Sequence, residues 1–127
     1  STMRKYTYLK FIFRVELFEV IYLKELRVHV VHKLGLSEAR RRLEEKMGEL
    51  MEQYEGKFTL ESTWKDNTLL FKLAAMGVKT EGTLEITDTT VTLAGTVPLV
   101  AIAFKKRIEE SVKRDLEEIL RVSTTPG

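Results

Sequence analysis

The stretch His32-Lys-Leu-Gly-Leu-Ser-Glu-Ala-Arg40 marks an abrupt change in the spacing of apolar side chains. Before it, alternate residues fall on one face of a strand: Leu26, Val28, Val30, His32 and Leu34. After it, apolar residues recur at helical spacing: Ala39, Leu43, Met47, Leu50, Met51 and Tyr54. Gly35 relaxes the backbone at the corner, and Ser37 is placed to accept a hydrogen bond from the first free helical N–H groups. The stretch therefore predicts a strand that turns directly into a helix capped by Ser37.

Turn-forming residues divide the rest of the chain into short apolar segments. Turns are predicted at 65–68 (Lys-Asp-Asn-Thr) and 87–90 (Thr-Asp-Thr-Thr). Gly77 and Gly82 are interpreted as turn or bulge positions that need a positive φ. Pro98 ends the last strand and opens an amphipathic helix over 99–120.

The predicted order over residues 26–122 is β-α-β-β-β-β-α, preceded by an extra N-terminal strand. This order predicts an α+β fold, in which an antiparallel sheet of four to six strands carries two helices packed on one face. The opposite face is expected to be polar and rich in threonine, with residues such as Thr59, Glu61, Thr63, Lys72, Thr83, Glu85, Thr90 and Thr92. Residues 123–127 are expected to fray as a tail.

Residues 1–25 form an N-terminal extension that is unusually apolar and aromatic. Ser1 and Thr2 are typical of a scar left by tag removal. The run that follows contains four charged residues, at positions 10, 14, 16 and 19. Because each charge at a bilayer centre costs about 2.5–3.5 kcal/mol, they argue against a transmembrane segment. A signal peptide is excluded for the same reason.

The extension is predicted to be an assembly element. Alternation over 9–17 favours a strand at 8–17, and a helix is the rival over 15–24. A strand with one apolar face must pair with a sheet edge of its own subunit or of a neighbour. No Gly, Pro or Asn stands between positions 5 and 34, so tight-turn chemistry is missing. We therefore expect a homodimer, with strand exchange as one form of it.

Composition indicates a single soluble domain. The chain has 127 residues, of which 43% are hydrophobic and 31% are charged. It contains no cysteine, and a cytoplasmic location is expected. The net charge of +2 does not predict binding to nucleic acid.

Enzyme signatures are absent from the sequence. It contains no glycine-rich phosphate loop, no Gly-x-Ser-x-Gly elbow and no assignable pair of facing carboxylates. His29 and His32 point to opposite faces of a strand, so they cannot chelate one metal together. The expectation is a non-enzyme with no catalytic residue, cofactor or metal site.

Two basic clusters, 40–42 and 105–107, have a nucleic-acid or phospholipid footprint as one interpretation. Each fans over some 200° of a helix, so neither forms one coherent stripe. Glutamates at positions 44, 45, 109 and 110 lie within one helical turn of these basic residues. They can therefore form ion pairs with them at i,i+3 and i,i+4 spacing. A solvated face with ion pairs is the favoured interpretation.

Several scattered residues stand in a recognisable order: His32, Leu34, Gly35, Ala39, Arg40, Trp64, Asp66, Phe71, Gly77, Val78 and Gly82. In this order and spacing the chain resembles the small bacterial family of polyhydroxyalkanoic acid system proteins. The resemblance implies a role beside storage-polyester metabolism, at granules. The family has no established catalytic mechanism, so the resemblance supplies a biological setting and no active site.

Five residues are the candidates for a functional or family-specific role: His32, Arg40, Trp64, Asp66 and Phe71. His32 is favoured as a hydrogen-bonded structural residue at the corner, with a catalytic or pH-sensing role as the alternative. Trp64 and Phe71 flank a hairpin around Asp66. Cross-strand core packing is favoured for them over an aromatic wall for an acyl or polymer ligand. Arg40 stands beside the corner and matches a family position.

Two functions compete. The first is a non-catalytic accessory or binding protein that contacts polyhydroxyalkanoate granules or granule proteins. The alternative is a small lipid- or acyl-chain-binding domain, because a curved sheet backed by helices can enclose an apolar cavity. That cavity would be lined by Phe58, Leu60, Trp64, Leu69, Phe71 and Leu84. DNA-linked regulation is disfavoured by the balanced charge.

Overall fold

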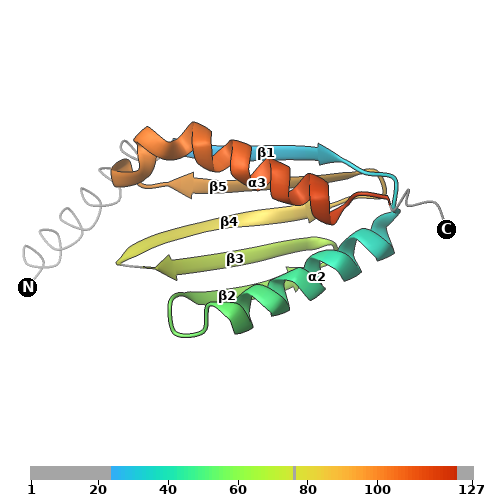
Figure 1. Cartoon of the computed structure of the whole chain (residues 1–127), viewed down its shortest axis with the longest axis horizontal. Helices are drawn as coiled ribbons and strands as arrows, with labels where there is room; N and C mark the ends of the chain where they lie inside the picture. The colour runs from blue at the N-terminus through green and yellow to red at the C-terminus, as the bar shows by residue number, and fades with distance from the viewer. Residues whose placement is uncertain (1–23, 76, 123–127) are drawn as a thin grey trace, which may run out of the picture.

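The computed structural model describes residues 24–75 and 77–122 (Figure 1). Its strands are β1 (Lys24–Val31), β2 (Thr59–Lys65), β3 (Thr68–Ala75), β4 (Val78–Ile86) and β5 (Thr90–Val97). Its helices are α2 (Leu36–Gln53), the 3-10 helix η1 (Leu99–Phe104) and α3 (Lys105–Ile119). The predicted α+β class is confirmed, and the predicted last helix begins as the 3-10 segment. The predicted strand over 8–17 and the tail 123–127 lie outside the described residues.

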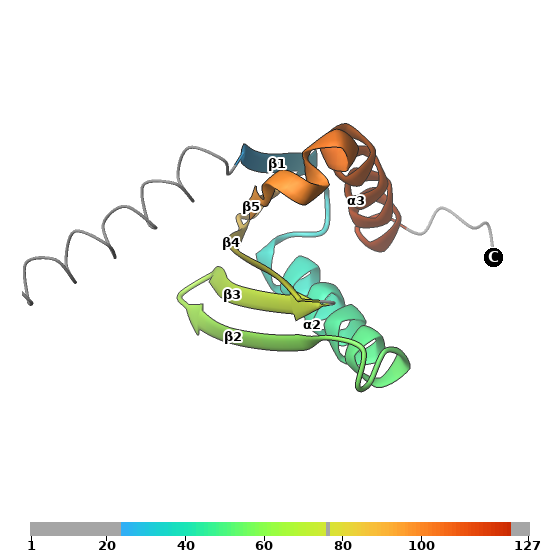
Figure 2. The same cartoon turned by 90° about the vertical axis from the view of Figure 1, so that its left-hand side faces the viewer.

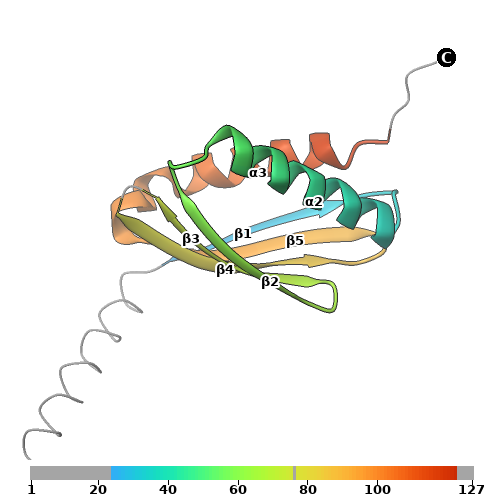
Figure 3. The ribbon, with the colours of Figure 1, turned by 90° about the horizontal axis from the view of Figure 1, so that it is seen from below.

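The five strands form one antiparallel sheet in the order β1-β5-β4-β3-β2. Figure 3 shows α2 and α3 on the same side of this sheet. Apolar residues at alternate strand positions face the helices, because side chains along a strand point to opposite faces. The buried core consists of Leu26, Val28, Val30, Ala39, Leu43, Leu69, Leu84, Ile86, Val91, Val97, Leu116 and Leu120.

The far face of the sheet has the predicted polar character. The eight residues named above for that face are all exposed or half-buried, and they occupy the strand positions between the core residues. His29 also lies there, and its Nδ1 is 2.8 Å from the Thr92 hydroxyl oxygen.

Two glycines face each other across β4 and β5. Gly82 pairs with Gly95 at the last rung of the β4–β5 ladder. A Cβ on Gly82 would overlap the Ala94 carbonyl oxygen and lie 2.8 Å from the Gly95 Cα. The prediction of a positive φ is right for Gly77 (φ 79°) and wrong for Gly82, whose requirement is steric. The sequence around Gly82 does not reveal this close approach, because the residues that Gly82 meets belong to β5.

The sheet divides beyond this glycine pair. Residues 78–81 of β4 continue to pair with β3, whereas Thr96 and Val97 of β5 pair with β1. Figure 2 shows the result: β1 and β5 lie with α3 in one part, and β2 and β3 lie with α2 in the other. The hydroxyl of Thr80 donates to the Thr96 carbonyl oxygen and still links the two parts.

The strand-to-helix corner forms where it was predicted, but its cap is different. Gly35 is the N-cap, with φ 81° and ψ 161°, a conformation that only glycine adopts readily. Ser37 is therefore already inside the helix, and the prediction that it caps α2 is wrong. Instead the Leu36 N–H donates to Asp88 Oδ1 at 3.2 Å, from the turn between β4 and β5. A residue 52 positions away thus satisfies a free helical N–H group.

This arrangement predicts unequal effects at two positions. The Asp88→Ala variant should lose about 1 kcal/mol in free energy of unfolding, the usual effect of removing a helix cap. The Ser37→Ala variant is the control and should change by less than about 0.5 kcal/mol, as surface substitutions do. Urea denaturation of both variants measures the difference. A loss at Ser37 equal to that at Asp88 would contradict the cap assignment.

Candidate functional site

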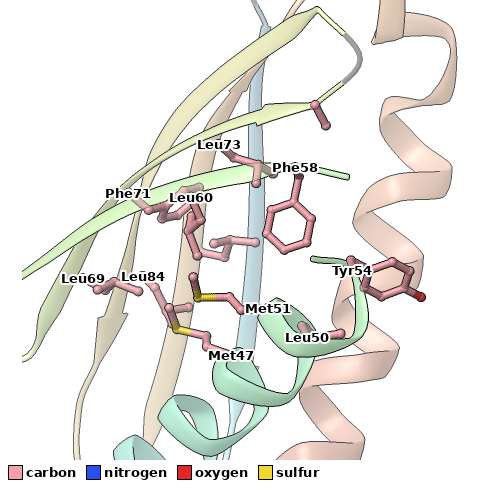
Figure 4. Close-up of a pocket in the computed structure, with 12 residues that line it drawn as sticks. Met47, Leu50, Met51, Tyr54, Phe58, Leu60, Leu69, Phe71, Leu73 and Leu84 are labelled. Carbon is pink, nitrogen blue, oxygen red and sulfur yellow. The ribbon is translucent and has the colours of Figure 1, made fainter. Parts of the chain in front are cut away.

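An apolar cavity of about 450 Å³ lies between the C-terminal half of α2 and the part of the sheet formed by β2, β3 and β4 (Figure 4). Twelve residues from the helix side and the sheet side line it: Met47, Leu50, Met51, Tyr54, Phe58, Leu60, Leu69, Phe71, Leu73, Ala75, Leu84 and Leu93. None of them is charged. The Tyr54 hydroxyl, the only polar side-chain group among them, points away from the other labelled side chains in Figure 4.

The burial of α2 changes along its length and explains the cavity. Ala39 and Leu43, in the first half, are fully packed against the sheet. Leu50, Met51 and Tyr54, at the other end, keep 37%, 46% and 40% of their surface exposed. The helix therefore leaves the sheet as it proceeds, and apolar side chains on both sides of the gap stay partly uncovered.

The cavity corresponds closely to the one that the alternative function, acyl-chain binding, requires. Five of the six predicted lining residues line it, including Phe71, and Trp64 does not. The contributions of α2 (Met47, Leu50 and Met51) and of Tyr54 were not predicted. Their spacing indicates an apolar helix face, but nothing in that spacing shows that the helix will diverge from the sheet.

The apolar lining of the cavity suits a ligand that binds through apolar contacts. Its volume falls within the range of about 300–1,000 Å³ that is typical of small-molecule sites. Met47 and Met51 are flexible and polarisable, so they can adapt to ligands of different shape. The lining residues include no carboxylate, imidazole, thiol or amine, and their one hydroxyl group, on Tyr54, points away from the other labelled side chains in Figure 4. The lining therefore offers mainly apolar contact area to a ligand.

His32 lies at the strand-to-helix corner, away from the cavity. It is buried, with 4% of its surface exposed. Its Nδ1 accepts the Leu34 N–H at 3.2 Å, which assigns the proton to Nε2, and Nε2–H donates to the Thr87 carbonyl oxygen at 3.1 Å. Its backbone N–H donates to the Thr89 carbonyl oxygen at 2.8 Å. Nε2 and the backbone N–H of His32 join the end of β1 to the β4–β5 turn, and Nδ1 holds the corner at Leu34, so both ring nitrogens are engaged in structural contacts.

Arg40, Trp64 and Asp66 are brought together at the β2–β3 hairpin. The Arg40 guanidinium stacks on the Trp64 ring, with Cζ 3.9 Å from the ring centroid. Arg40 Nη1 donates to the Asp66 carbonyl oxygen at 3.0 Å and to Asn67 Oδ1 at 3.1 Å. Asp66 has φ 55°, as its position in a tight turn predicts. Trp64 is half-buried and packs against the core. The cluster fastens α2 to the hairpin and lies outside the cavity.

The other two arginines of the 40–42 cluster are engaged in ion pairs. Arg41 contacts Glu38 at 2.7 Å and Glu45 at 2.8 Å, and Arg42 contacts Glu38 at 3.0 Å. Hydrogen bonds from Arg41 and Arg42 lower the pKa of Glu38 to about 2. These contacts agree with the predicted ion-pair-laced face.

Arg42 also connects the two helices. Its Nη1 donates to the carbonyl oxygens of Ile119 at 3.2 Å and Arg121 at 2.7 Å. These carbonyl groups stand at the end of α3, where a cation is favourable for the helix dipole. The beginning of α2 and the end of α3 are therefore joined, in contrast to the open end of α2.

Within residues 24–75 and 77–122, no helix is long and apolar enough to cross a membrane. The same part of the chain contains no group of three or more His, Cys, Asp or Glu side chains that could hold a metal ion.

The stacked pair predicts a measurable coupling. In a double-mutant cycle of Arg40→Met and Trp64→Leu, the interaction free energy should be about 0.5–1 kcal/mol, the size of a partly exposed cation–π contact. Arg41→Met is the matched control, because Arg41 pairs with Glu38 and Glu45 and not with Trp64. Its cycle with Trp64→Leu should give a coupling near zero. Equal couplings in the two cycles, measured by urea denaturation, would contradict a specific contact.

Comparison with known proteins places the chain in a family. Residues 26–120 match the family described as "Putative polyhydroxyalkanoic acid system protein". No curated protein and no solved structure gives a match. The matched segment contains α2, β2, β3, β4, β5 and α3 in full, and therefore includes every residue that lines the cavity. The chain belongs to the polyhydroxyalkanoic acid system protein family.

Proposed function

We propose that this protein is a non-catalytic accessory protein of polyhydroxyalkanoate storage that binds an apolar chain in the cavity between α2 and the sheet. The observation that carries the proposal is the uncharged 450 Å³ cavity in a member of this family. Its place of action would be the cytoplasm, at the surface of the storage granule or beside granule proteins.

The chemistry of a polyhydroxyalkanoate supports this choice of ligand. The polymer is a polyester of hydroxyacyl units, so it presents alkyl side chains between ester groups. An uncharged cavity lined by leucine, methionine and phenylalanine can take up such an alkyl chain and leave the esters in water at the mouth. Burying five or six methylene groups would contribute about 4–5 kcal/mol before the unfavourable terms of association. This magnitude favours weak, reversible attachment.

A second candidate function is a small acyl-chain-binding domain that takes up free fatty acids or their derivatives. The hollow between α2 and the sheet favours it, since a flat apolar patch would suffice for adsorption to a granule. Both functions use the same cavity residues. They differ in whether the ligand is the polymer surface or a molecule in solution.

The proposal predicts that one leucine at the cavity mouth is required for granule binding. Leu50→Glu places a carboxylate among apolar residues, where it is poorly solvated. The fraction of protein that sediments with isolated granules should then fall by about tenfold, equivalent to 1.4 kcal/mol. Leu70→Glu is the matched control, because Leu70 is 42% exposed on the far face of the sheet and Leu50 is 37% exposed. This control should sediment like the parent protein.

A phasin serves as the positive control for sedimentation. Recovery of the parent protein entirely in the supernatant would contradict granule binding, and equal losses in the two variants would contradict a role of the cavity. Binding of a fluorescent fatty acid, lost in Leu50→Glu and retained in Leu70→Glu, without sedimentation of the parent protein would select the second candidate function.

A further inference from the structure

We propose that two copies of this chain join through the outer edge of β2 and form one continuous antiparallel sheet. β1 and β2 are the two edge strands of the sheet in one copy. An edge strand carries backbone N–H and C=O groups that have no ladder partner, so it is a template for pairing with another strand. The two edges of this sheet differ in how these groups are covered, and the difference favours β2 as the contact.

The β1 edge is blocked by α3. The backbone N–H of Arg27, in the middle of β1, donates to Glu109 Oε2 of α3 at 3.0 Å. Lys105 lies 3.6 Å from the same carboxylate and helps to hold it in place. A strand that added to β1 would have to displace Glu109 from this donor, and covering an edge with a helix is a common way to prevent such pairing.

The β2 edge has no such cover in the described part of the chain, where the backbone of β2 forms hydrogen bonds only in its ladder with β3. Lys65 and Thr68 flank a two-residue turn and therefore form a hydrogen-bonded pair. Bonded and non-bonded pairs alternate along an antiparallel ladder, so Leu60, Ser62 and Trp64 direct their N–H and C=O groups away from β3. These groups are free to pair with another strand.

The charges on β2 make a second copy of the same strand a complementary partner. When two β2 strands run antiparallel about a two-fold axis at Thr63, Glu61 of each copy lies opposite the partner's Lys65. Opposite charges directly across a strand pair are favourable. Both side chains are exposed on the far face of the sheet, and neither takes part in an ion pair among the described residues. In the same register the free backbone groups of Ser62 meet those of the partner's Trp64, so backbone pairing and charge agree on one arrangement.

This dimer would carry both cavities on the same side. A two-fold axis between antiparallel edge strands stands perpendicular to the sheet, so the helices of both copies lie on one side of it. Figure 3 shows α2 and α3 on one side of the sheet in each copy. The consequence for binding rests on the proposed function: a granule would be held through two cavities, and attachment of the second would be intramolecular. Weak binding by each cavity would then give firm retention of the dimer.

Cross-linking of the full chain tests the register. The chain has no cysteine, so Thr63→Cys carries a unique thiol. In the proposed dimer the two residues at position 63 form a non-hydrogen-bonded pair with Cα atoms about 4.5 Å apart, within the range of about 4.4–6.8 Å that a disulfide bridges. Arg27→Cys is the matched control, because Arg27 is exposed in the middle of the other edge strand.

Under mild oxidation we expect Thr63→Cys to run mainly as a disulfide-linked dimer on a non-reducing gel and Arg27→Cys to run as a monomer. Equal cross-linking of the two variants, or no cross-linking of Thr63→Cys, would overturn the proposal.

Charge reversal tests the same contact without a covalent bond. Lys65→Glu places a glutamate opposite the partner's Glu61, so two favourable pairs become unfavourable. The dissociation constant of the dimer, measured by sedimentation equilibrium, should then rise about tenfold. Lys79→Glu is the matched control, because Lys79 is exposed on the same face of the sheet and stands opposite Ala74 in β3. It should dimerise like the parent protein.

Mixing two variants restores the charge pairs. Glu61→Lys alone should also weaken the dimer, but an equimolar mixture of Glu61→Lys and Lys65→Glu forms heterodimers with two opposite-charge pairs. We expect dimerisation to return in this mixture. A parent protein that stays monomeric, a dimer unaffected by Lys65→Glu, or a mixture that fails to recover would overturn the proposal. These samples contain neither ligand nor granules, so the results stand apart from the proposed function.

The effect on granule attachment is tested with the same variant. Lys65→Glu leaves the cavity residues unchanged, so a fluorescent fatty acid should bind each chain as tightly as in the parent. Sedimentation with isolated granules should nevertheless fall, because each chain now attaches through one cavity. Sedimentation equal to that of the parent would overturn two-point attachment.

Discussion

The close approach of β4 and β5 at Gly82 and Gly95 is the constraint on which the functional surface depends. No side chain fits at Gly82, because a Cβ there would overlap the backbone of β5. The two strands can cross tightly at this point and then separate, so that the sheet becomes two parts, each with its own helix (Figure 2). A larger residue at Gly82 would force the strands apart where they now meet. The cavity lies on the part of the divided sheet that faces α2, where the C-terminal half of this helix diverges from the strands.

The two ends of the molecule are stabilised by different interactions. At one end, polar contacts hold the corner closed: His32 binds the β4–β5 turn, Asp88 caps α2 and Arg42 binds the end of α3. At the other end, α2 presents partly exposed apolar side chains, and among the described residues no polar side-chain contact joins that end of the helix to the sheet. Polar contacts fix one end of α2 in position, and apolar surface at the other end is left available. A fixed corner and an adaptable apolar end of α2 suit a binding protein, because the scaffold stays rigid while the opening of the cavity accepts chains of different shape.

Much of the fold could be predicted from local patterns, and the errors occurred where distant residues act. Alternation identified which residues of each strand face the helices, because that property depends only on neighbouring positions. The cap of α2 was assigned to Ser37 because sequence reasoning looks within the same segment, whereas Asp88 comes from another turn. Gly82 was interpreted from its own conformational freedom, but its role depends on Gly95 in a different strand.

The candidate site shows the same limit. A cavity beneath a curved sheet was expected only under the alternative function, and most of its sheet residues could be named because they share one strand face. Trp64 shares that face but is held against Arg40 instead, a contact that spans the helix and the hairpin. The contribution of α2 was not predicted, since an amphipathic helix looks the same in sequence whether or not it leaves the sheet.

Ligand binding in the cavity can be tested most directly by NMR on protein with isotope-labelled methionine methyl groups. Met47 and Met51 line the cavity, so they report on its contents. With a medium-chain fatty acid added, magnetisation should pass from the acyl protons to the methyl groups of Met47 and Met51. Transfer to neither methionine at saturating fatty acid would contradict binding in the cavity.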